Sequence, residues 1–333
     1  MSAAGRPAGD EGSPSPADDA PAGTAAPIEA RGQGGRRRED FRRLHRLRVR
    51  WAEVDLQGIV FNGHYLLYLD TALGEHWRAM ALPYVDALRR LGGDLFVRHA
   101  ALDYRAPARF DDLLEVGVRC ERIGTSSITF GGALFRHERA LVEGELVYVF
   151  ADPATLASRP VPPPLRRLLR AYEAGEPMFE VRTGDWAALG EDARALRTEV
   201  FAQEQGIPPG MMCDAADPGA LHAVAYNRLG MPLATGRLVE RGSGVAQIGR
   251  MAVRQQMRGG GVGRALLSAL HAGAAERGGR ELMLHAEASA AGFYARAGYV
   301  PRGATFQQGG LTHIEMVWAP RSGQDRPPEE PPT

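Results

Sequence analysis

Two hydrophobic periodicities divide the first half of the chain into elements. Leu47, Val49 and Trp51 alternate with arginine, which is the period of a strand that buries one face. Over residues 64–82, apolar side chains recur at helical spacing and the opposite face is also largely apolar, which predicts a buried helix. Four further strand-like runs follow, at residues 95–105, 113–122, 127–136 and 141–151. One strand, one buried helix and an antiparallel meander predict a curved sheet wrapped round a helix.

The second half has a different order of elements and begins beyond a proline cluster at residues 160–164. A short helix at residues 165–173 is expected to close the first domain. Beyond it, the pattern predicts helices at residues 191–205, 262–277 and 290–297, and strands at residues 179–182, 221–227, 232–240, 246–253, 281–286 and 312–318. We therefore expect an α+β protein in which a first domain, residues 41–175, is followed by a mixed α/β domain, residues 176–320.

The two ends of the chain are polar and rich in proline. Residues 1–40 contain almost no large apolar side chain, so burial cannot offset the entropy of ordering them. The arginine run at residues 36–38 is expected to be solvated, although it could contact an acidic partner. We predict disordered tails at residues 1–40 and 321–333.

Composition excludes several classes of protein. The 333 residues carry 40 basic and 40 acidic side chains, a balance that argues against binding to nucleic acid. No apolar run approaches the roughly 18 residues that cross a bilayer, and the N-terminus lacks an apolar signal core. We therefore expect a cytoplasmic protein without a membrane span. All 40 basic side chains are arginines, which excludes a Schiff-base lysine and a phosphate-loop lysine. The two cysteines, Cys120 and Cys213, cannot build a thiolate zinc site, and we expect no metal.

An acidic residue in a tight turn stands just before the predicted buried helix. Asp55 and Gly58 occupy the turn, and the predicted helix begins at His64. The first turn of a helix has free backbone N–H groups that can stabilise an oxyanion. A nearby carboxylate can attack a thioester carbon or activate water. The same spacing also fits a type I turn with aspartate first and glycine fourth, so the residues alone leave a purely structural role open.

Residues 54–65 resemble the hotdog-fold thioesterases of the 4-hydroxybenzoyl-CoA thioesterase/YbgC type, which share an Asp-x-x-Gly-Ile/Val-Val-aromatic segment and then a tyrosine. The resemblance covers about residues 41–173. It implies a hotdog fold, an acyl-CoA substrate and a homodimer or homotetramer. By this resemblance Asp55 is the catalytic carboxylate, and the Asn62 N–H is an oxyanion donor. His64 and Tyr65 would lie beside the thioester, although His64 could instead cap or pack the helix. Many relatives carry an aromatic residue where this chain has Asn62.

A second constellation combines a strand, a glycine-rich loop and a helix. The strand covers residues 248–253. The loop consists of Arg258, Gly259, Gly260, Gly261, Val262 and Gly263. Glycines let a backbone approach a bulky anion, and a helix N-terminus adds free N–H groups, so this arrangement predicts a pyrophosphate-binding loop. Its spacing and late position differ from the dinucleotide-binding fingerprint.

This region resembles the GCN5-related N-acetyltransferases (GNAT), in particular the ElaA/YjcF branch, over roughly residues 178–319. The acetyl-CoA motif of that family is matched by Arg258, Gly261 and Gly263. Further signatures resemble residues 197–206, 284–287 and 291–299. The resemblance implies a mixed α/β domain that binds acetyl-CoA.

In that family an amine attacks the acetyl thioester directly. The resemblance implies that strand residues Met251, Ala252 and Val253 hold the acetyl and pantetheine groups, and that Tyr294 protonates the departing CoA thiolate. Tyr294 could instead be a core residue. Candidate general bases, each of which could equally be structural, are Glu204, His285, Glu287 and His313.

These expectations combine into a bifunctional CoA-thioester enzyme. It would hydrolyse acyl-CoA with its first half and transfer acetyl from acetyl-CoA to an unidentified amine with its second half, with CoA as substrate and product. The alternative is an acyl-CoA-binding sensor or scaffold in which one half is catalytically silent. A serine hydrolase is excluded because the chain has no Gly-x-Ser-x-Gly segment.

Overall fold

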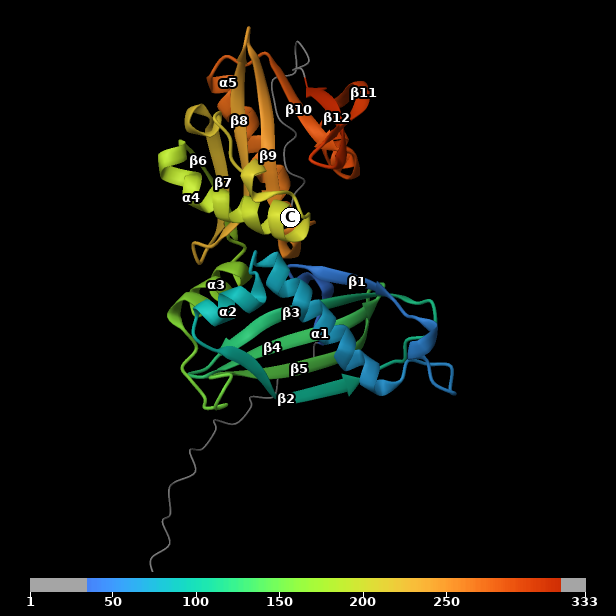
Figure 1. Cartoon of the computed structure of the whole chain (residues 1–333). Coiled ribbons are helices and arrows are strands. Elements are labelled where there is room, and N and C mark those ends of the chain that lie inside the picture. Colours follow the sequence, from blue (N-terminus) through green and yellow to red (C-terminus); the bar gives the residue numbers. More distant parts are fainter. Residues whose placement is uncertain (1–34, 319–333) are drawn as a thin grey trace, which may run out of the picture. The chain divides into compact units, whose positions relative to one another are not determined.

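The computed structural model describes residues 35–318, and the remainder of both predicted tails lies outside that range. The first part is an antiparallel five-stranded sheet in the order β1-β3-β4-β5-β2 (Figure 1). Its strands are β1 Leu44–Arg48, β2 Asp94–Tyr104, β3 Leu113–Ile123, β4 Ser127–Arg136 and β5 Arg139–Ala151. Its helices are α1 Asn62–Ala79, α2 Tyr84–Arg90 and α3 Pro163–Glu173. All four predicted strands are therefore present close to their expected positions. The prediction that they form one meander is wrong for β2, which pairs with β5 at the edge of the sheet, while β1 takes the place beside β3.

The first strand ends earlier than the alternation of residues predicts. Trp51 lies in the short 3-10 turn η2, Trp51–Glu53, and its side chain is 75% exposed. The chain leaves the sheet after the Val49 N–H has bonded to the Asp112 carbonyl. The prediction that Trp51 belongs to a half-buried strand is wrong, because the alternation continues past the last position that β3 can pair.

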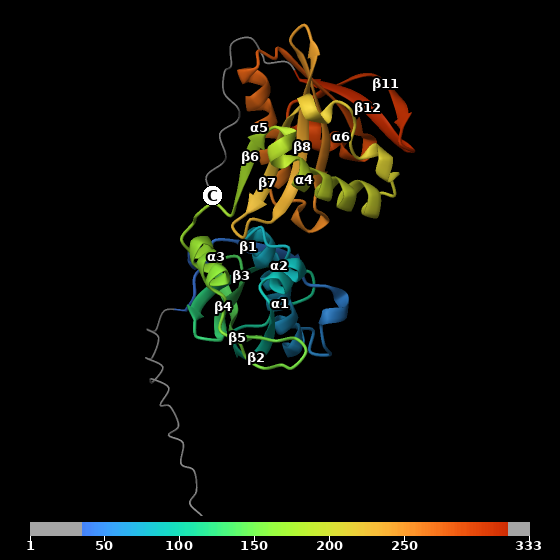
Figure 2. The same ribbon diagram turned by 60° about the vertical axis from the view of Figure 1, so that its left-hand side comes forward.

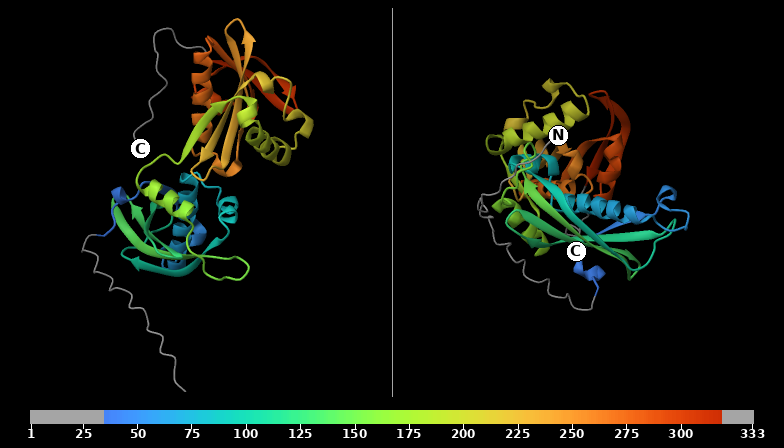
Figure 3. Two further views of the ribbon diagram at one scale, coloured as in Figure 1. Left: turned by 90° about the vertical axis from the view of Figure 1, so that its left-hand side faces the viewer. Right: turned by 90° about the horizontal axis from the view of Figure 1, so that it is seen from below.

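Helix α1 packs closely on one face of this sheet (Figure 3). Leu69, at its middle, is fully buried. A Cβ atom at Gly132 of β4 would lie 2.4 Å from Cδ2 of Leu69, and one at Gly144 of β5 would lie 2.8 Å from Cδ1. Two glycines on neighbouring strands thus let the helix approach the sheet at this point.

The opposite face of the sheet is covered in part by residues 36–41. The Arg36 guanidinium lies 3.1 Å from Oε1 of Glu121, and Arg38 forms an ion pair with Glu115. The Phe41 ring covers Gly117 of β3, where a Cβ atom would lie 2.3 Å from the ring. The prediction that the arginine run belongs to a solvated tail is wrong for Arg36 and Arg38. Their partners lie on β3, about 80 residues away in the sequence, and only the fold brings them together.

The second part is a seven-stranded sheet in the order β11-β12-β10-β9-β8-β7-β6, and α4 and α5 cover its opposite faces (Figure 2). Its strands are β6 Phe179–Gly184, β7 Leu221–Asn227, β8 Pro232–Gly242, β9 Val245–Val253, β10 Glu281–Glu287, β11 Val300–Gln308 and β12 Leu311–Trp318. Its helices are α4 Trp186–Arg197, α5 Val262–Glu276 and α6 Ala291–Arg296. Only β9 and β10 run parallel to each other among these neighbours. The sheet and its helices agree with the expected mixed α/β arrangement.

Two elements of this part differ from the prediction. Strand β11 was not expected, because it lies at the edge of the sheet and its side chains are mostly exposed, which leaves no alternating pattern. The predicted helix at residues 191–205 is instead α4 followed by a π-helical segment, η3 (Thr198–Glu204). Within residues 35–318 we find no helix with the length and apolar character to cross a membrane.

Two candidate active sites

The predicted acidic turn before α1 is a tight hairpin. Val54 and Val60 form a bridge, and the Asp55 N–H donates to the Ile59 carbonyl at 2.9 Å. The Gly58 N–H donates to the Asp55 carbonyl at 2.9 Å, and Gly58 has a φ of 72°, which favours glycine. The turn therefore fixes Asp55 just before the helix, as the spacing predicts.

The Asp55 carboxylate takes part in its own turn. Its Oδ1 accepts a hydrogen bond from the Gln57 N–H at 2.8 Å, and the residue is half-buried. Within residues 35–318, Oδ2 accepts no hydrogen bond. Oδ1 thus stabilises the turn, which is the structural role that the sequence left open, and Oδ2 is available to act on a substrate.

Helix α1 begins beside this hairpin without a cap. Phe61 precedes the first turn, no side chain of residues 35–318 caps the free N–H groups, and no acidic residue lies in that turn. Asn62 is exposed, and its carbonyl accepts a hydrogen bond from the Tyr104 hydroxyl at 3.1 Å. His64 is half-buried with its ring against Phe61. An uncapped, exposed N-terminus of this kind can bind an oxyanion.

Tyr65 lies deeper than the prediction suggested. It is buried, and its hydroxyl oxygen accepts a hydrogen bond from the Ala108 N–H at 2.8 Å. Burial raises its pKa above that of free tyrosine. The hydroxyl thus ties α1 to the segment after β2, and the side chain positions the helix beneath the site.

A buried carboxylate that the sequence analysis missed supports the same loop. Glu53 accepts hydrogen bonds from the Tyr68 hydroxyl at 2.7 Å and from the backbone N–H and side chain of Arg50. Burial alone would raise the pKa of Glu53, but these donors hold it below its ordinary value. The ionised Glu53 therefore fastens η2 to α1. The pairing joins residues 15 positions apart through a loop, and no local pattern indicates it.

Large apolar side chains surround the hairpin on the protein surface. The exposed residues there include Trp51, Leu56, Phe61 and Phe110. Trp51 and Phe110 contact each other edge to face, with ring centroids 5.5 Å apart. Exposed apolar residues gathered in this way indicate a surface that another molecule covers.

In the second part, strand β9 carries a bulge next to an open edge. Thr235 pairs with Ala252 and Arg237 with Gly249, so Arg250 and Met251 together face the single residue Gly236. The pairing of β9 with β10 ends at Ile248 and Leu284. Residues 249–253, which include the predicted Met251, Ala252 and Val253, therefore present backbone groups that no strand pairs on that side within residues 35–318.

The glycine-rich loop leads directly into α5. Gly259 and Gly261 have φ values of 80° and 84°, and a Cβ atom at either would meet no other atom within 4 Å. The helix begins at Val262 without an acid in its first turn, and in the described part of the chain no side chain caps it. A Cβ atom at Gly263 would lie 3.4 Å from Cγ2 of Val253 and 3.7 Å from Phe293. The loop with its intervening Gly260 thus lies beside the end of β9 and beside α6, with open space above it.

Arg258 of this loop is held by one of the candidate bases. Its two terminal nitrogens donate to the two carboxylate oxygens of Glu204, each at 2.6 Å, and its Nε donates to the Val253 carbonyl at 3.1 Å. Both carboxylate oxygens of Glu204 are already engaged by Arg258 and are not turned toward an amine. Among the four candidate bases, Glu204 is therefore the least suited to that role.

The other proposed groups lie nearby. Tyr294 of α6 is 8% exposed, and burial raises its pKa to about 12, so its phenol is protonated at neutral pH. The register of β10 and β12 pairs His285 with Glu315 and Glu287 with His313, which places all four side chains on one face. Gln205 donates to Glu287 at 3.3 Å, which brings the end of η3 to that face. No group of three side chains suited to a metal ion occurs in the part of the chain that is described.

The chain matches models of two protein families. Residues 57–143 match the thioesterase superfamily, and residues 197–320 match the acetyltransferase (GNAT) domain. It is 31% identical over 128 residues to the uncharacterised N-acetyltransferase YjcF of Bacillus subtilis, covering 38% of this chain and 90% of that protein. It is 28% identical over 117 residues to the acyl-CoA thioester hydrolase YbgC of Escherichia coli, covering 35% of this chain and 87% of that protein. A thioesterase from Thermus thermophilus, solved with coenzyme A and zinc, is 27% identical with a TM-score of 0.36, covering 42% of this chain and 99% of its own. Both family resemblances predicted from the motifs are confirmed.

Proposed function

Because residues 57–143 belong to the thioesterase superfamily and residues 197–320 to the GNAT acetyltransferases, we propose that this chain is a bifunctional enzyme of CoA thioesters. Its first domain, residues 41–175, hydrolyses acyl-CoA. Its second domain, residues 176–320, transfers acetyl from acetyl-CoA to an amine.

The observation that carries the first activity is a carboxylate with one unbonded oxygen beside an uncapped helix start. Oδ2 of Asp55 either activates a water molecule or attacks the thioester carbon itself. The N–H groups of the first turn, with Asn62 and His64 at its surface, stabilise the oxyanion that develops on the carbonyl oxygen. The C–S bond then breaks, and the CoA thiolate leaves and takes up a proton. If water has attacked, the free acid is released directly; if Asp55 has attacked, water then hydrolyses the acyl-aspartyl anhydride to the acid and restores the carboxylate.

The surroundings of the hairpin support assembly through this domain. Its exposed apolar side chains, such as Trp51 and Leu56, contact water in a single copy of the chain, and an association that covers them would be favourable. Strand β2 lies at the edge of its sheet and is 11 residues long, so its unpaired backbone can bind a second strand. We propose that a second copy covers these features, in a homodimer or homotetramer, so that the hydrolytic site lies next to the partner.

The second activity rests on the open edge of β9 beside the glycine-rich loop. The backbone of residues 251–253 binds the acetyl and pantetheine groups, and the loop with the start of α5 binds the pyrophosphate. The amine nitrogen attacks the acetyl carbon, the C–S bond breaks, and Tyr294 donates its proton to the departing thiolate. The proton lost by the amine passes to a base on the exposed face of β10 and β12, where His285, Glu287 and His313 lie.

The test uses two variants that each remove one activity. Asp55→Asn is expected to lower acyl-CoA hydrolysis at least about 100-fold and to leave acetyl transfer unchanged, since the carboxylate alone acts on the thioester carbon or on water. Tyr294→Phe is expected to spare CoA affinity and hydrolysis but to slow acetyl transfer. The measurements are thiol release from an acyl-CoA panel and mass-spectrometric detection of acetylated amines.

Each variant serves as the control for the other. If wild-type turnover persists in a folded Asp55→Asn protein, the assignment of the carboxylate fails. If the wild-type chain binds CoA in both domains but turns over in only one, the sensor or scaffold alternative holds for the silent half.

A further inference from the structure

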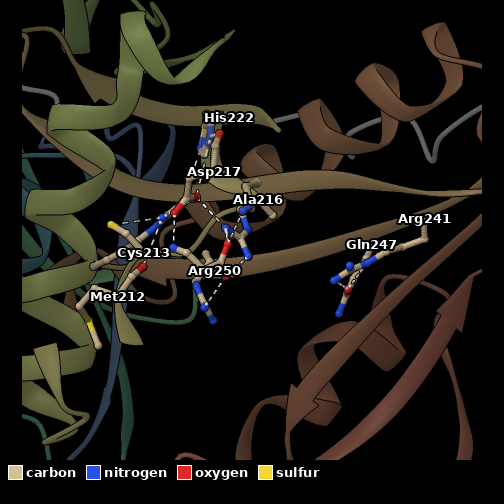
Figure 4. Close-up of polar contacts among 11 residues, drawn as sticks. Met212, Cys213, Ala216, Asp217, His222, Arg241, Gln247 and Arg250 are labelled. Carbon is tan, nitrogen blue, oxygen red and sulfur yellow. Dashed lines mark hydrogen bonds and ion pairs between the residues drawn. The ribbon is translucent and has the colours of Figure 1, made fainter. Parts of the chain in front are cut away.

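A buried charge network lies on the α4 side of the second sheet, outside the groups assigned above. Arg197 of α4 is fully buried and donates to Oδ1 of Asp217 at 2.9 Å. Arg237 of β8 donates to the same oxygen at 2.7 Å and to both carboxylate oxygens of Asp214. Arg250 of β9 donates from Nη2 to Oδ2 of Asp214 at 2.8 Å (Figure 4). These five side chains form one connected network.

The network holds one more positive than negative charge, because three guanidinium groups face two carboxylates. His222 contributes no charge, since burial lowers its pKa and keeps the ring neutral. Arg197 and Arg237 share Asp217, and Arg237 also occupies both oxygens of Asp214. The charge of Arg250 is therefore the least compensated of the three.

Arg250 also has unused hydrogen-bond donors. Within residues 35–318, Nη2 is the one nitrogen of this side chain that donates a hydrogen bond, and Nε is buried without a partner. The side chain is 27% exposed, so it can contact a ligand. Burial and the charge of Arg237 lower its pKa below that of free arginine, as expected for a cation with too few counter-charges.

The backbone at this position is strained. Arg250 has a φ of 54° in the β9 bulge, a left-handed conformation that is unfavourable for a residue with a Cβ atom. Strain of this kind is concentrated at functional sites, where the surrounding structure holds it in place. The bulge directs Arg250 away from α5. Its neighbour Met251 lies on the α5 face, because a Cβ atom at Gly236 would meet Met251 Sδ, Leu270 and Leu266.

Arg250 therefore lies on the same face as the candidate bases. The last residue pair of the parallel strands β9 and β10 is Ile248 with Leu284. Arg250 follows two residues later on β9, and the position opposite it on β10 is Ala286. His285 and Glu287 are the neighbours of Ala286 along β10. Gln205, just after η3, bonds to Glu287 and shows that this face is the one covered by α4 and η3. An amine held beside Glu287 could thus place a second group at Arg250.

We propose that Arg250 binds a carboxylate of the acetyl acceptor, so that the second domain acetylates amines that also carry an acid, such as an amino acid or a short peptide. The inference rests on the proposed acetyltransferase activity and names its substrate class. Nη1 of Arg250 donates a charge-assisted hydrogen bond to the carboxylate, and the excess positive charge of the network strengthens this bond. The amine is then held near Glu287 and the acetyl thioester.

The test compares amines that differ only in the acid. Glycine, L-alanine, L-methionine and L-phenylalanine are each assayed as free acid and as carboxamide, with putrescine as an amine that has no acid. The assay uses Asp55→Asn protein, so that hydrolysis of acetyl-CoA does not obscure transfer. We expect kcat/KM for at least one acid to exceed that of its amide by about tenfold or more, and Arg250→Gln to abolish this preference. Arg250→Lys should restore part of it.

A matched control separates binding from a structural role. Arg241→Gln removes an exposed arginine that pairs with Gln247, apart from the network in Figure 4, and should leave the preference unchanged. A structural role for Arg250 predicts that Arg250→Gln lowers the rates for acids and amides equally, and that result would overturn the proposal. Equal rates for acids and amides in the unaltered protein would overturn it too.

The proposed function and this inference can fail separately. If no amine is acetylated, the activity itself is absent, and the carboxylate site is then judged by saturation-transfer NMR. The probes are the N-acetylated acids and their amides, added to CoA-loaded protein. Binding of the acids over the amides, lost in Arg250→Gln, would support the carboxylate site, and equal binding would refute it.

Discussion

Replacing Phe41 by alanine tests how much the segment before β1 stabilises the first domain against unfolding. The ring is 6% exposed, covers Gly117 and contacts Phe135 edge to face at 5.9 Å. A buried aromatic side chain removes roughly 150–250 Å² from water at about 25 cal/mol per Å², and Phe→Ala changes in cores cost about 3–5 kcal/mol. Because Phe41 covers an outer sheet face, we expect the lower end, about 3 kcal/mol for Phe41→Ala. That corresponds to a fall of roughly 10 °C in the unfolding midpoint of a domain of this size.

Differential scanning calorimetry of the full chain tests this value. The transition of the first domain should move, and acetyl transfer with its own transition should not, which provides an internal control. A chain that begins at Gly35 keeps the contacts that Arg36, Arg38 and Phe41 make within residues 35–318, and it should unfold like the full chain. One that begins at Arg42 should lose more stability than Phe41→Ala, because the ion pairs are removed as well. A shift under 1 or 2 °C in Phe41→Ala would show that the ring contributes little, and the reasoning from its burial would be refuted.

Three further variants probe the sites and the core. Gly261→Ala must place a side chain at a φ of 84°, and we expect CoA affinity measured by calorimetry to fall about tenfold, whereas Gly74→Ala, in a helix with room for a Cβ, should bind CoA normally. Glu204→Gln frees Arg258 from its ion pair and should raise CoA affinity about two- to fivefold. The gain is small because the Arg258 and Glu204 side chains are 43% and 34% exposed, and ion pairs so exposed to water are weak. A loss of acetyl transfer at saturating CoA would instead identify Glu204 as the base. His76 is buried with its pKa lowered to about 4, so the unfolded chain binds the extra proton between about pH 4 and 6.5 and stability falls as the pH drops through that window. His76→Leu should flatten this pH dependence of the urea midpoint, and an unchanged slope would contradict the assignment.

Local features of the sequence predicted the structure of both candidate catalytic segments well. The hairpin at Asp55, the uncapped start of α1 and the glycine-rich loop before α5 each depend on residues that are neighbours along the chain. Glycine at a positive φ, or an aspartate that bonds to the N–H two residues on, acts within a few positions. The positions of most strands along the chain could be predicted for the same reason. A strand with one buried face shows alternating apolar and polar residues, whichever strand it pairs with.

Elements without such a local signal were missed or misplaced. Strand β11 is an exposed edge strand that exists because β12 pairs with it. Helix α4 ends at Arg197, which is buried in an ion pair with Asp217, and the chain continues as a π-helix over residues that read as one helix. In both cases a tertiary contact overrode the periodicity.

The sequence by itself determined the two families, most of the order of the elements and the two candidate catalytic segments, because motif and hydrophobic period are short-range properties. Only the tertiary structure decided which charges meet. It joined Glu53 to Tyr68, Glu204 to Arg258, and the arginines of α4, β8 and β9 to Asp214 and Asp217. Each pair comes from segments separated by 15 to 54 residues, and strand register and a bulge set which side chains face each other. A charged residue has no pattern that names its partner, since the energy of a buried ion pair depends on distance and burial, and both are properties of the fold.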